Sequence, residues 1–195
     1  MNGTLAGIFV GGAATRMGGI AKGLLRTECG QTIVERSRHI LERLGVPVVL
    51  VGVRREYMGL GLDVVADEPG GIGPLGGVVA LLRRARGAQV LALGGDMPFV
   101  SSEFLERLLA ASDGAPIVAP RREGRWEPLC ARYDPARVLA PALALVRARE
   151  HSLQRLLAAV GAAELCLEPN GAEQLGDWDT REDVERSARC HSRSK

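Results

Sequence analysis

Short apolar runs alternate with helix-like segments along most of the chain, and this alternation limits the fold more than any other feature. Leu5 to Val10 is typical of a buried strand that stops at a glycine pair. Further strands are predicted at 47–53, 62–66, 90–93, 117–119 and 164–167. Helices are predicted from 32 onwards, over 75–86, around 101–109 and in two pieces over 135–159. Alternating strands and helices build βαβ units, so we predict an α/β fold with a mostly parallel, Rossmann-like sheet between two helical layers.

Helix-start signals place several of these elements. Thr32 and Glu35 have the spacing of a capping box, and either Ser101 or Ser102 can cap the helix that contains Phe104. The segment 121–133 alternates like an extended excursion. A terminal helix is expected from Thr180, with a frayed tail after about residue 188.

Length and charge narrow the function. A chain of 195 residues suits one domain over 1–195, and 25 basic against 23 acidic residues give a net charge of +2. This balance does not favour nucleic acid or an anionic membrane as partner, so we expect a small-molecule ligand. No apolar stretch approaches the roughly 18 residues of a membrane helix, and no signal peptide is visible. A cytoplasmic location is therefore expected.

Cysteines and histidines give no sign of a reactive centre. The four cysteines lie too far apart for a zinc knuckle or a dense disulfide framework. The three histidines have no carboxylate or hydroxyl motif beside them, which favours packing or solvated roles. Hydrolysis or acyl transfer would normally require such groups.

The segment Phe9 to Leu25 carries the strongest chemical signal. Paired Gly11 and Gly12 end a strand and allow backbone N–H groups to approach an anion, with Arg16 and Lys22 close by. The spacing fits neither the dinucleotide fingerprint nor a Walker loop, and a glycine-rich turn with incidental charges is the alternative. Lys22 and Lys195 are the only lysines, so a lysine kept here favours a phosphate contact, although chance is an alternative.

A second candidate lies at the end of the strand over 90–93. Asp96 follows Gly94 and Gly95 at the carboxyl edge where α/β sheets bind ligands, and a carboxylate there suits Mg²⁺. Alternatively, Asp96 caps the next helix or orders the turn before Pro98. Together with the glycine loop, the metal interpretation is favoured.

These motifs resemble a known family. FVGGAATRMGG with Lys22, then Asp67, Gly73-Pro74-Leu75-Gly76-Gly77 and Gly95-Asp96-Met97-Pro98, are similar to the molybdenum cofactor guanylyltransferases. That family belongs to the glycosyltransferase-A-like nucleotidyltransferases and implies a fold of the nucleotide-diphospho-sugar transferase type. The resemblance runs from residue 5 to about residue 185. Gly11-Gly12 looks like the guanylyl branch, because related cytidylyltransferases more often have Ala-Gly there.

The resemblance implies a reaction and a set of roles. GMP would pass from GTP to the phosphate of molybdopterin, releasing pyrophosphate. A phosphate monoester is mostly ionised at neutral pH, so no general base is required. Residues implied in nucleotide binding are Phe9, Val10, Gly11, Gly12, Lys22, Asp67, Gly76 and Asp96. Arg16, Lys22 and Asp96 would be catalytic, and Mg²⁺ would be bound by Asp96 and, if it does not simply cap the last helix, Asp179.

Other segments are assigned more weakly. Glu127-Pro128-Leu129 resembles the acceptor side, and Asp177-Trp178-Asp179-Thr180 a late Asn-x-Asn-Thr segment. Trp126 is a weak candidate for stacking on the pterin, amid arginines that are individually better explained as solvated: Arg121, Arg122, Arg125 and Arg132. Transient contacts with molybdenum cofactor biosynthesis proteins or molybdoenzymes are also expected.

Departures from the family pattern keep other functions open. Ala21 and Val51 replace an expected Asp and Asn, and aspartates replace both asparagines at 177 and 179. The alternatives are a nucleotidyltransferase that uses CTP or another phosphorylated acceptor, and a GTP-binding homologue with impaired catalysis. A nicotinamide oxidoreductase is disfavoured, because the glycine spacing is wrong and no acidic residue closes the second strand.

Overall fold

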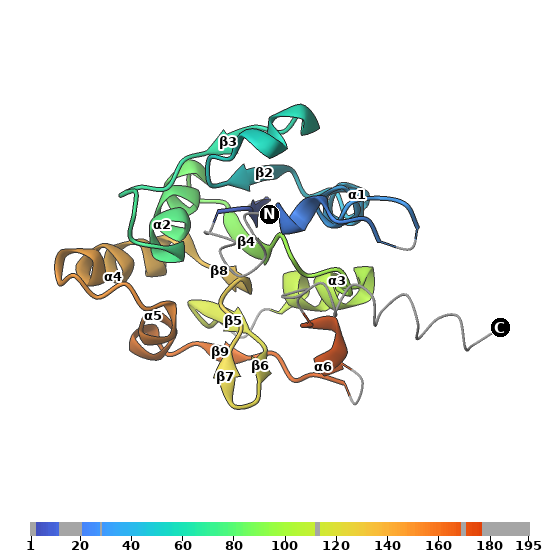
Figure 1. Cartoon of the computed structure of the whole chain (residues 1–195). Coiled ribbons are helices and arrows are strands. Elements are labelled where there is room, and N and C mark those ends of the chain that lie inside the picture. Colours follow the sequence, from blue (N-terminus) through green and yellow to red (C-terminus); the bar gives the residue numbers. More distant parts are fainter. Residues whose placement is uncertain (1–2, 12–20, 28, 112–113, 169–170, 177–195) are drawn as a thin grey trace.

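The structure is a computed structural model, and it describes residues 3–11, 21–27, 29–111, 114–168 and 171–176 (Figure 1). A seven-stranded sheet with strand order β3-β2-β1-β4-β8-β5-β9 runs through the described part. Its strands are β1 (Thr4–Phe9), β2 (Val48–Val51), β3 (Val64–Val65), β4 (Gln89–Gly94), β5 (Ile117–Ala119), β8 (Cys130–Tyr133) and β9 (Ala163–Glu164). A small separate hairpin pairs β6 (Arg121–Arg122) with β7 (Arg125–Trp126).

Strand directions confirm the predicted mostly parallel sheet. β1 pairs in parallel with β2 and β4, β2 with β3, and β5 with β9. Only β8 runs antiparallel to its neighbours within this sheet, where it lies between β4 and β5.

Helices cover both faces of the sheet, as Figure 1 shows. They are α1 (Ile33–Arg43), α2 (Pro74–Arg84), α3 (Ser102–Ala110), α4 (Pro135–Arg147), α5 (Leu153–Val160) and α6 (Gly171–Gln174), with the 3₁₀ turns η2 (Lys22–Leu24) and η3 (Arg55–Leu60). α2, α4 and α5 lie on one side, and α1 and α3 on the other. Each side has its own buried apolar cluster, so the predicted three-layer α/β/α arrangement is confirmed.

Alternation along β1 decides which residues face which helical layer. Ala6 and Ile8 are fully buried in the cluster beneath α1 and α3. Gly7 and Phe9 face α2, and a Cβ at Gly7 would lie 2.8 Å from Val51 Cγ2 and would collide with Leu81. Because successive side chains point to opposite faces, the glycine lets α2 pack directly against the middle of the sheet.

Two expectations about strands require correction. The segment 121–133 was expected to be an extended excursion, but its end forms β8, a central strand of the sheet. Alternating apolar and polar residues indicate that a segment is extended. Which strand the segment pairs with depends on long-range contacts, which the pattern does not contain. The last strand was expected at 164–167 but is Ala163–Glu164, and beyond it Arg107 donates to the Cys166 carbonyl at 2.8 Å.

The helix caps follow the sequence signals. Glu35 N donates to Thr32 Oγ1 at 3.2 Å and Thr32 N donates to Glu35 Oε2 at 2.8 Å, which confirms the capping box of α1. At α3 the N-cap is Ser101 and not Ser102, because Ser101 Oγ accepts a 3.2 Å hydrogen bond from Phe104 N. None of the helices in the described ranges is long and apolar enough to cross a membrane.

The two serines at the start of α3 provide a stability test. Replacing the N-cap in Ser101→Ala should lower the free energy of unfolding by about 1 kcal/mol, because the Phe104 N–H loses its partner. Ser102→Ala is the matched control, since Ser102 is already inside the helix and its Oγ donates to exposed Glu106 rather than capping a backbone N–H. Urea denaturation measures both variants, and an equal loss in the two would contradict the assignment of Ser101 as the cap.

Candidate functional site

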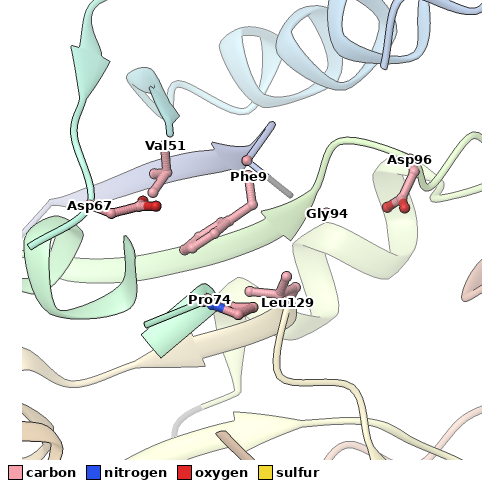
Figure 2. A pocket seen from close by; sticks show the side chains of 9 residues that line it. Phe9, Val51, Asp67, Pro74, Gly94, Asp96 and Leu129 are labelled. Carbon is pink, nitrogen blue, oxygen red and sulfur yellow. The ribbon is translucent and has the colours of Figure 1, made fainter. Parts of the chain in front are cut away.

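A pocket of about 150 Å³ opens at the carboxyl edge of the parallel strands. Figure 2 shows Asp67 and Asp96 near opposite ends of this pocket, with the ring of Phe9 between them. The lining residues are Phe9, Gly11, Val51, Asp67, Gly73, Pro74, Gly94, Asp96 and Leu129. They come from the ends of β1, β2 and β4, the loop after β3, the start of α2 and the residue before β8. Ligands of open α/β sheets bind at this edge.

Glycines allow the strand ends to come together around the pocket. Gly52, just after β2, has φ +100°, and a Cβ on it would lie 2.8 Å from Gly11 N. Any other residue at position 52 would therefore be strained and would push the end of β1 away. Gly11 is itself exposed and lines the pocket, so its backbone forms part of the pocket wall.

Gly77 plays a similar part on the side of α2. A Cβ at this position would lie 2.8 Å from both the Phe9 ring and Val51, and 3.0 Å from Asp67 Oδ1. Three pocket residues thus converge on a buried helix position that has room only for a hydrogen atom. Position 77 was not among the predicted site residues, although the motif that contains it was.

Asp67 is a half-buried carboxylate at one end of the pocket. Burial raises the pKa of Asp67 above its usual value, because the charged form loses contact with water. Apolar Phe9 and Val51 stand nearby. A carboxylate held in such surroundings is costly for stability and is typical of a functional group.

Asp96 and Lys22 meet at the other end. Lys22 Nζ lies 3.9 Å from Asp96 Oδ2, and the two side chains are 18% and 36% exposed. The loop that carries Asp96 is joined to β1 by a backbone contact, since Gly95 N donates to the Phe9 carbonyl at 2.9 Å. Gly11 and Asp96 both line the pocket and Lys22 lies beside Asp96, so these three residues are close together in the described part of the chain.

The remaining predicted residues are placed differently. Val10 is buried on the opposite face, in the cluster beneath α1 and α3, and does not line the pocket. Gly76 is buried in the first turn of α2, where a Cβ would collide with the Pro69 carbonyl. Pro74 and Gly73 line the pocket instead. Gly12, Arg16, Asp177 and Asp179 lie outside the described residues.

Two of the departures from the family pattern, Val51 and Ala21, lie within the described residues, and Val51 lines the pocket. Val51 is fully buried and presents an apolar wall where the resemblance led us to expect an asparagine. Ala21 begins the turn η2 and supplies no side-chain hydrogen bond to it.

The residues predicted to lie on the acceptor side are found in two places, the pocket and the β6–β7 hairpin. Leu129 lines the pocket, and its carbonyl accepts a 2.6 Å hydrogen bond from Gly94 N. Trp126 instead stacks on Arg121, with the guanidinium carbon 3.9 Å from the ring centre. Its backbone N–H donates to the Gln154 side chain, and its carbonyl accepts from the same side chain. Arg122 pairs with Glu127 at 2.9 Å. In this conformation Trp126 lies in the hairpin and is not a pocket residue.

The donor set is compatible with Mg²⁺. Mg²⁺ is commonly held by one or two carboxylates together with substrate phosphates and water, and Asp96 is a partly exposed carboxylate beside the glycine wall. Within the described ranges, no group of three or more His, Cys, Asp or Glu side chains forms a self-contained metal site. The residues thus fit an ion that arrives with a polyphosphate better than one held by the protein alone.

Gly52 and Tyr57 are the local features that reasoning from sequence missed. Gly52 follows the predicted second strand directly, so a glycine at a strand end was the available signal. Tyr57 lies in η3, which was not predicted, and its phenol oxygen accepts a hydrogen bond from Gly23 N at 3.1 Å. No sequence pattern signals this contact.

Comparison with known proteins agrees with this geometry. Residues 6–164 match the family model described as the MobA-like NTP transferase domain. A relative from Opitutus terrae, named "Probable molybdenum cofactor guanylyltransferase", is 32% identical over 197 residues and covers 96% of each chain. The molybdenum cofactor guanylyltransferase of Pseudomonas putida is 35% identical over 156 residues, covering 77% of this chain and 80% of the relative.

Solved structures share the fold at lower identity. Molybdopterin-guanine dinucleotide biosynthesis protein A from Archaeoglobus fulgidus has a TM-score of 0.75 at 21% identity, covering 96% of this chain and 98% of the other. The 2-C-methyl-D-erythritol 4-phosphate cytidylyltransferase of Thermus thermophilus has a TM-score of 0.67 at 19% identity, covering 95% and 98%.

A pocket that is lined by a glycine at a strand end and by an aspartate paired with a lysine suits a nucleoside triphosphate. The family model covers most of the chain, and the match with the relative from Opitutus terrae extends over nearly its whole length. The chain belongs to the MobA-like NTP transferase family and is a nucleotidyltransferase.

Proposed function

We propose that this enzyme transfers GMP from GTP to the phosphate of molybdopterin, giving molybdopterin guanine dinucleotide and pyrophosphate. The observation that carries the proposal is that Gly11 and Asp96 line one pocket and that Lys22 pairs with Asp96 at its edge. The names of the relatives from Opitutus terrae and Pseudomonas putida support guanylyl transfer in particular.

The chemistry requires alignment and charge neutralisation more than proton transfer. An oxygen of the acceptor phosphate attacks the α-phosphorus of GTP, the bond to the bridging oxygen of the β-phosphate breaks, and its electron pair leaves with pyrophosphate. The attacking phosphate is already ionised, and no histidine lines the described pocket. Two anions must still be brought together, which favours cationic and N–H groups at the site.

Each pocket residue has a proposed role in this arrangement. The exposed backbone beside Gly11 and the Lys22 ammonium bind the triphosphate, and Arg16 is proposed to assist them. Asp96 is proposed to hold Mg²⁺, with Asp179 as a further candidate ligand; when bound, the ion would offset phosphate charge. Asp67 and Phe9 line the opposite end of the pocket and are proposed to contact the nucleoside.

Two related functions remain as alternatives. A cytidylyltransferase shares this fold, so the fold alone does not distinguish GTP from CTP. The second alternative is a homologue that binds GTP without turnover. It is considered because Ala21 and Val51 replace polar side chains in the loop and in the pocket wall. Contacts with other molybdenum cofactor proteins and a location in the cytoplasm are further parts of the proposal.

A direct assay distinguishes these functions. The purified protein should release pyrophosphate when GTP, Mg²⁺ and molybdopterin are all present, and should form the guanine dinucleotide. With CTP in place of GTP we expect at least about tenfold less product, because a pocket that contacts the base discriminates by its contacts. A preference for CTP would support the cytidylyltransferase, and Mg²⁺-dependent GTP binding without pyrophosphate would support the impaired homologue.

Removing the charged pair should abolish most turnover. Lys22→Ala and Asp96→Ala are each expected to lower kcat/KM for GTP by about 100-fold or more, since each removes a group that stabilises charge on the phosphates. Asp63→Ala is the control: it removes an exposed aspartate that pairs with Arg84 at 3.1 Å outside the pocket, and activity should persist. Wild-type pyrophosphate release by either pocket variant would contradict these roles.

Asp67→Asn should separate stability from binding. Burial raises the folded-state pKa of Asp67 above its usual value of 3.8, so ionisation destabilises the folded protein as pH rises through that raised pKa. The asparagine variant lacks this cost, and its stability advantage should be negligible below about pH 4 and grow towards pH 7. Nucleotide affinity should fall because the carboxylate is lost.

Urea denaturation at several pH values, together with GTP titration, checks this trade-off. A variant that is less stable than wild type at pH 7 would show that the carboxylate is a structural partner. Unchanged affinity for GTP would show that Asp67 does not contact the nucleotide.

A further inference from the structure

Tyr57 has a buried phenol that the proposed reaction does not use. It lies in η3, directly after β2, and the residue is only 4% exposed. Its oxygen accepts a 3.1 Å hydrogen bond from Gly23 N, which joins segments 34 residues apart in the chain. Gly23 is the neighbour of Lys22, so this contact is made next to the ammonium-bearing residue of the pocket.

The turn η2 lacks a local partner for this amide. Its N-cap is Ala21, which has no side-chain hydrogen bond to the turn. A capping side chain ordinarily accepts from the second or third amide of a helical turn, and Gly23 is the second residue of η2. Alanine offers no acceptor, so the Tyr57 phenol supplies from a distance what residue 21 does not.

Gly23 is also fixed by packing on its other sides. A Cβ there would lie 2.6 Å from Val34 Cγ2 and 2.8 Å from the Gly95 carbonyl, besides 3.0 Å from the Tyr57 oxygen. The backbone of η2 is therefore held between α1, Tyr57 and the loop that carries Asp96. These main-chain contacts fix the position of the Lys22 backbone relative to the loop that carries Asp96.

The Tyr57 hydroxyl keeps its proton in this setting. Burial raises the pKa of Tyr57, because a phenolate would lose its hydration. The neutral hydroxyl can accept the Gly23 N–H and still has its own proton to donate.

We propose that Tyr57 is a positioning residue for the triphosphate site: its hydroxyl fixes the Gly23 amide and thereby holds Lys22 beside Asp96. This inference rests on the proposed function, because it concerns the affinity of the site for GTP. A lysine side chain has many rotamers, so the placement of its backbone decides how often the ammonium meets the phosphates.

A double-mutant cycle tests the proposal. The proteins are wild type, Tyr57→Phe, Lys22→Ala and the double variant, and the readout is the Kd for GTP with Mg²⁺, followed to millimolar GTP so that weak binding stays measurable. Tyr57→Phe keeps the ring and should weaken GTP binding about fivefold when Lys22 is present. In the Lys22→Ala background the same change should alter the Kd by less than about twofold, because the residue it positions is gone.

Ser152→Ala is the matched control for a general loss of stability. It removes the N-cap of α5, whose Oγ accepts from Arg155 N at 3.3 Å, and no residue of α5 lines the pocket. Ser152→Ala should lower the melting temperature about as much as Tyr57→Phe does. Its GTP affinity should nevertheless equal that of wild type. Equal weakening in Ser152→Ala and Tyr57→Phe would overturn the proposal.

The other outcomes separate this inference from the proposed function. If Tyr57→Phe weakens binding equally with and without Lys22, or not at all, Tyr57 does not act through Lys22, whereas the proposed function stands. If wild type itself does not bind GTP, the proposed function fails, and with it the inference.

Discussion

The hydrogen bond from Gly95 N to the Phe9 carbonyl is the constraint on which the site depends. It joins the ends of β1 and β4 at 2.9 Å and continues the parallel pairing of these central strands one step beyond the sheet. The loops that leave these ends carry Lys22 and Asp96. Parallel strands end at the same edge, so the sheet brings the two loops together there, and Lys22 Nζ lies 3.9 Å from Asp96 Oδ2.

Glycine and a buried tyrosine complete this arrangement in different ways. Gly52 and Gly77 remove side-chain volume, which brings the backbone and the lining residues close enough to form a small pocket. Tyr57 adds a hydrogen bond where the local chain has no acceptor. The site therefore combines close backbone packing with one long-range polar contact. In addition, it holds the half-buried carboxylate of Asp67, whose charged form is disfavoured by burial.

Local signals predicted the fold well where they act over a few residues. The capping box at Thr32, the strand–glycine pattern after Leu5 and the amphipathic helices all appear where expected, because propensity and periodicity are properties of neighbouring residues. The pairing of β8 between β4 and β5 was missed, and the last strand was misplaced at one end. Strand order is decided by contacts between distant segments, which alternation alone does not encode.

The sequence by itself determined the residue types of the site and their place at strand ends. The glycine pairs, Asp67 and Asp96 each follow an apolar run, and Lys22 lies in the segment after the first pair. The resemblance of these motifs to guanylyltransferases pointed to the family that the comparisons support. Only the tertiary structure decided that Val10 and Gly76 do not line the pocket, and that Gly52, Pro74 and Leu129 line or shape it. The physical reason is that chemistry belongs to single side chains, whereas their orientation depends on how strands and helices pack across the whole sheet.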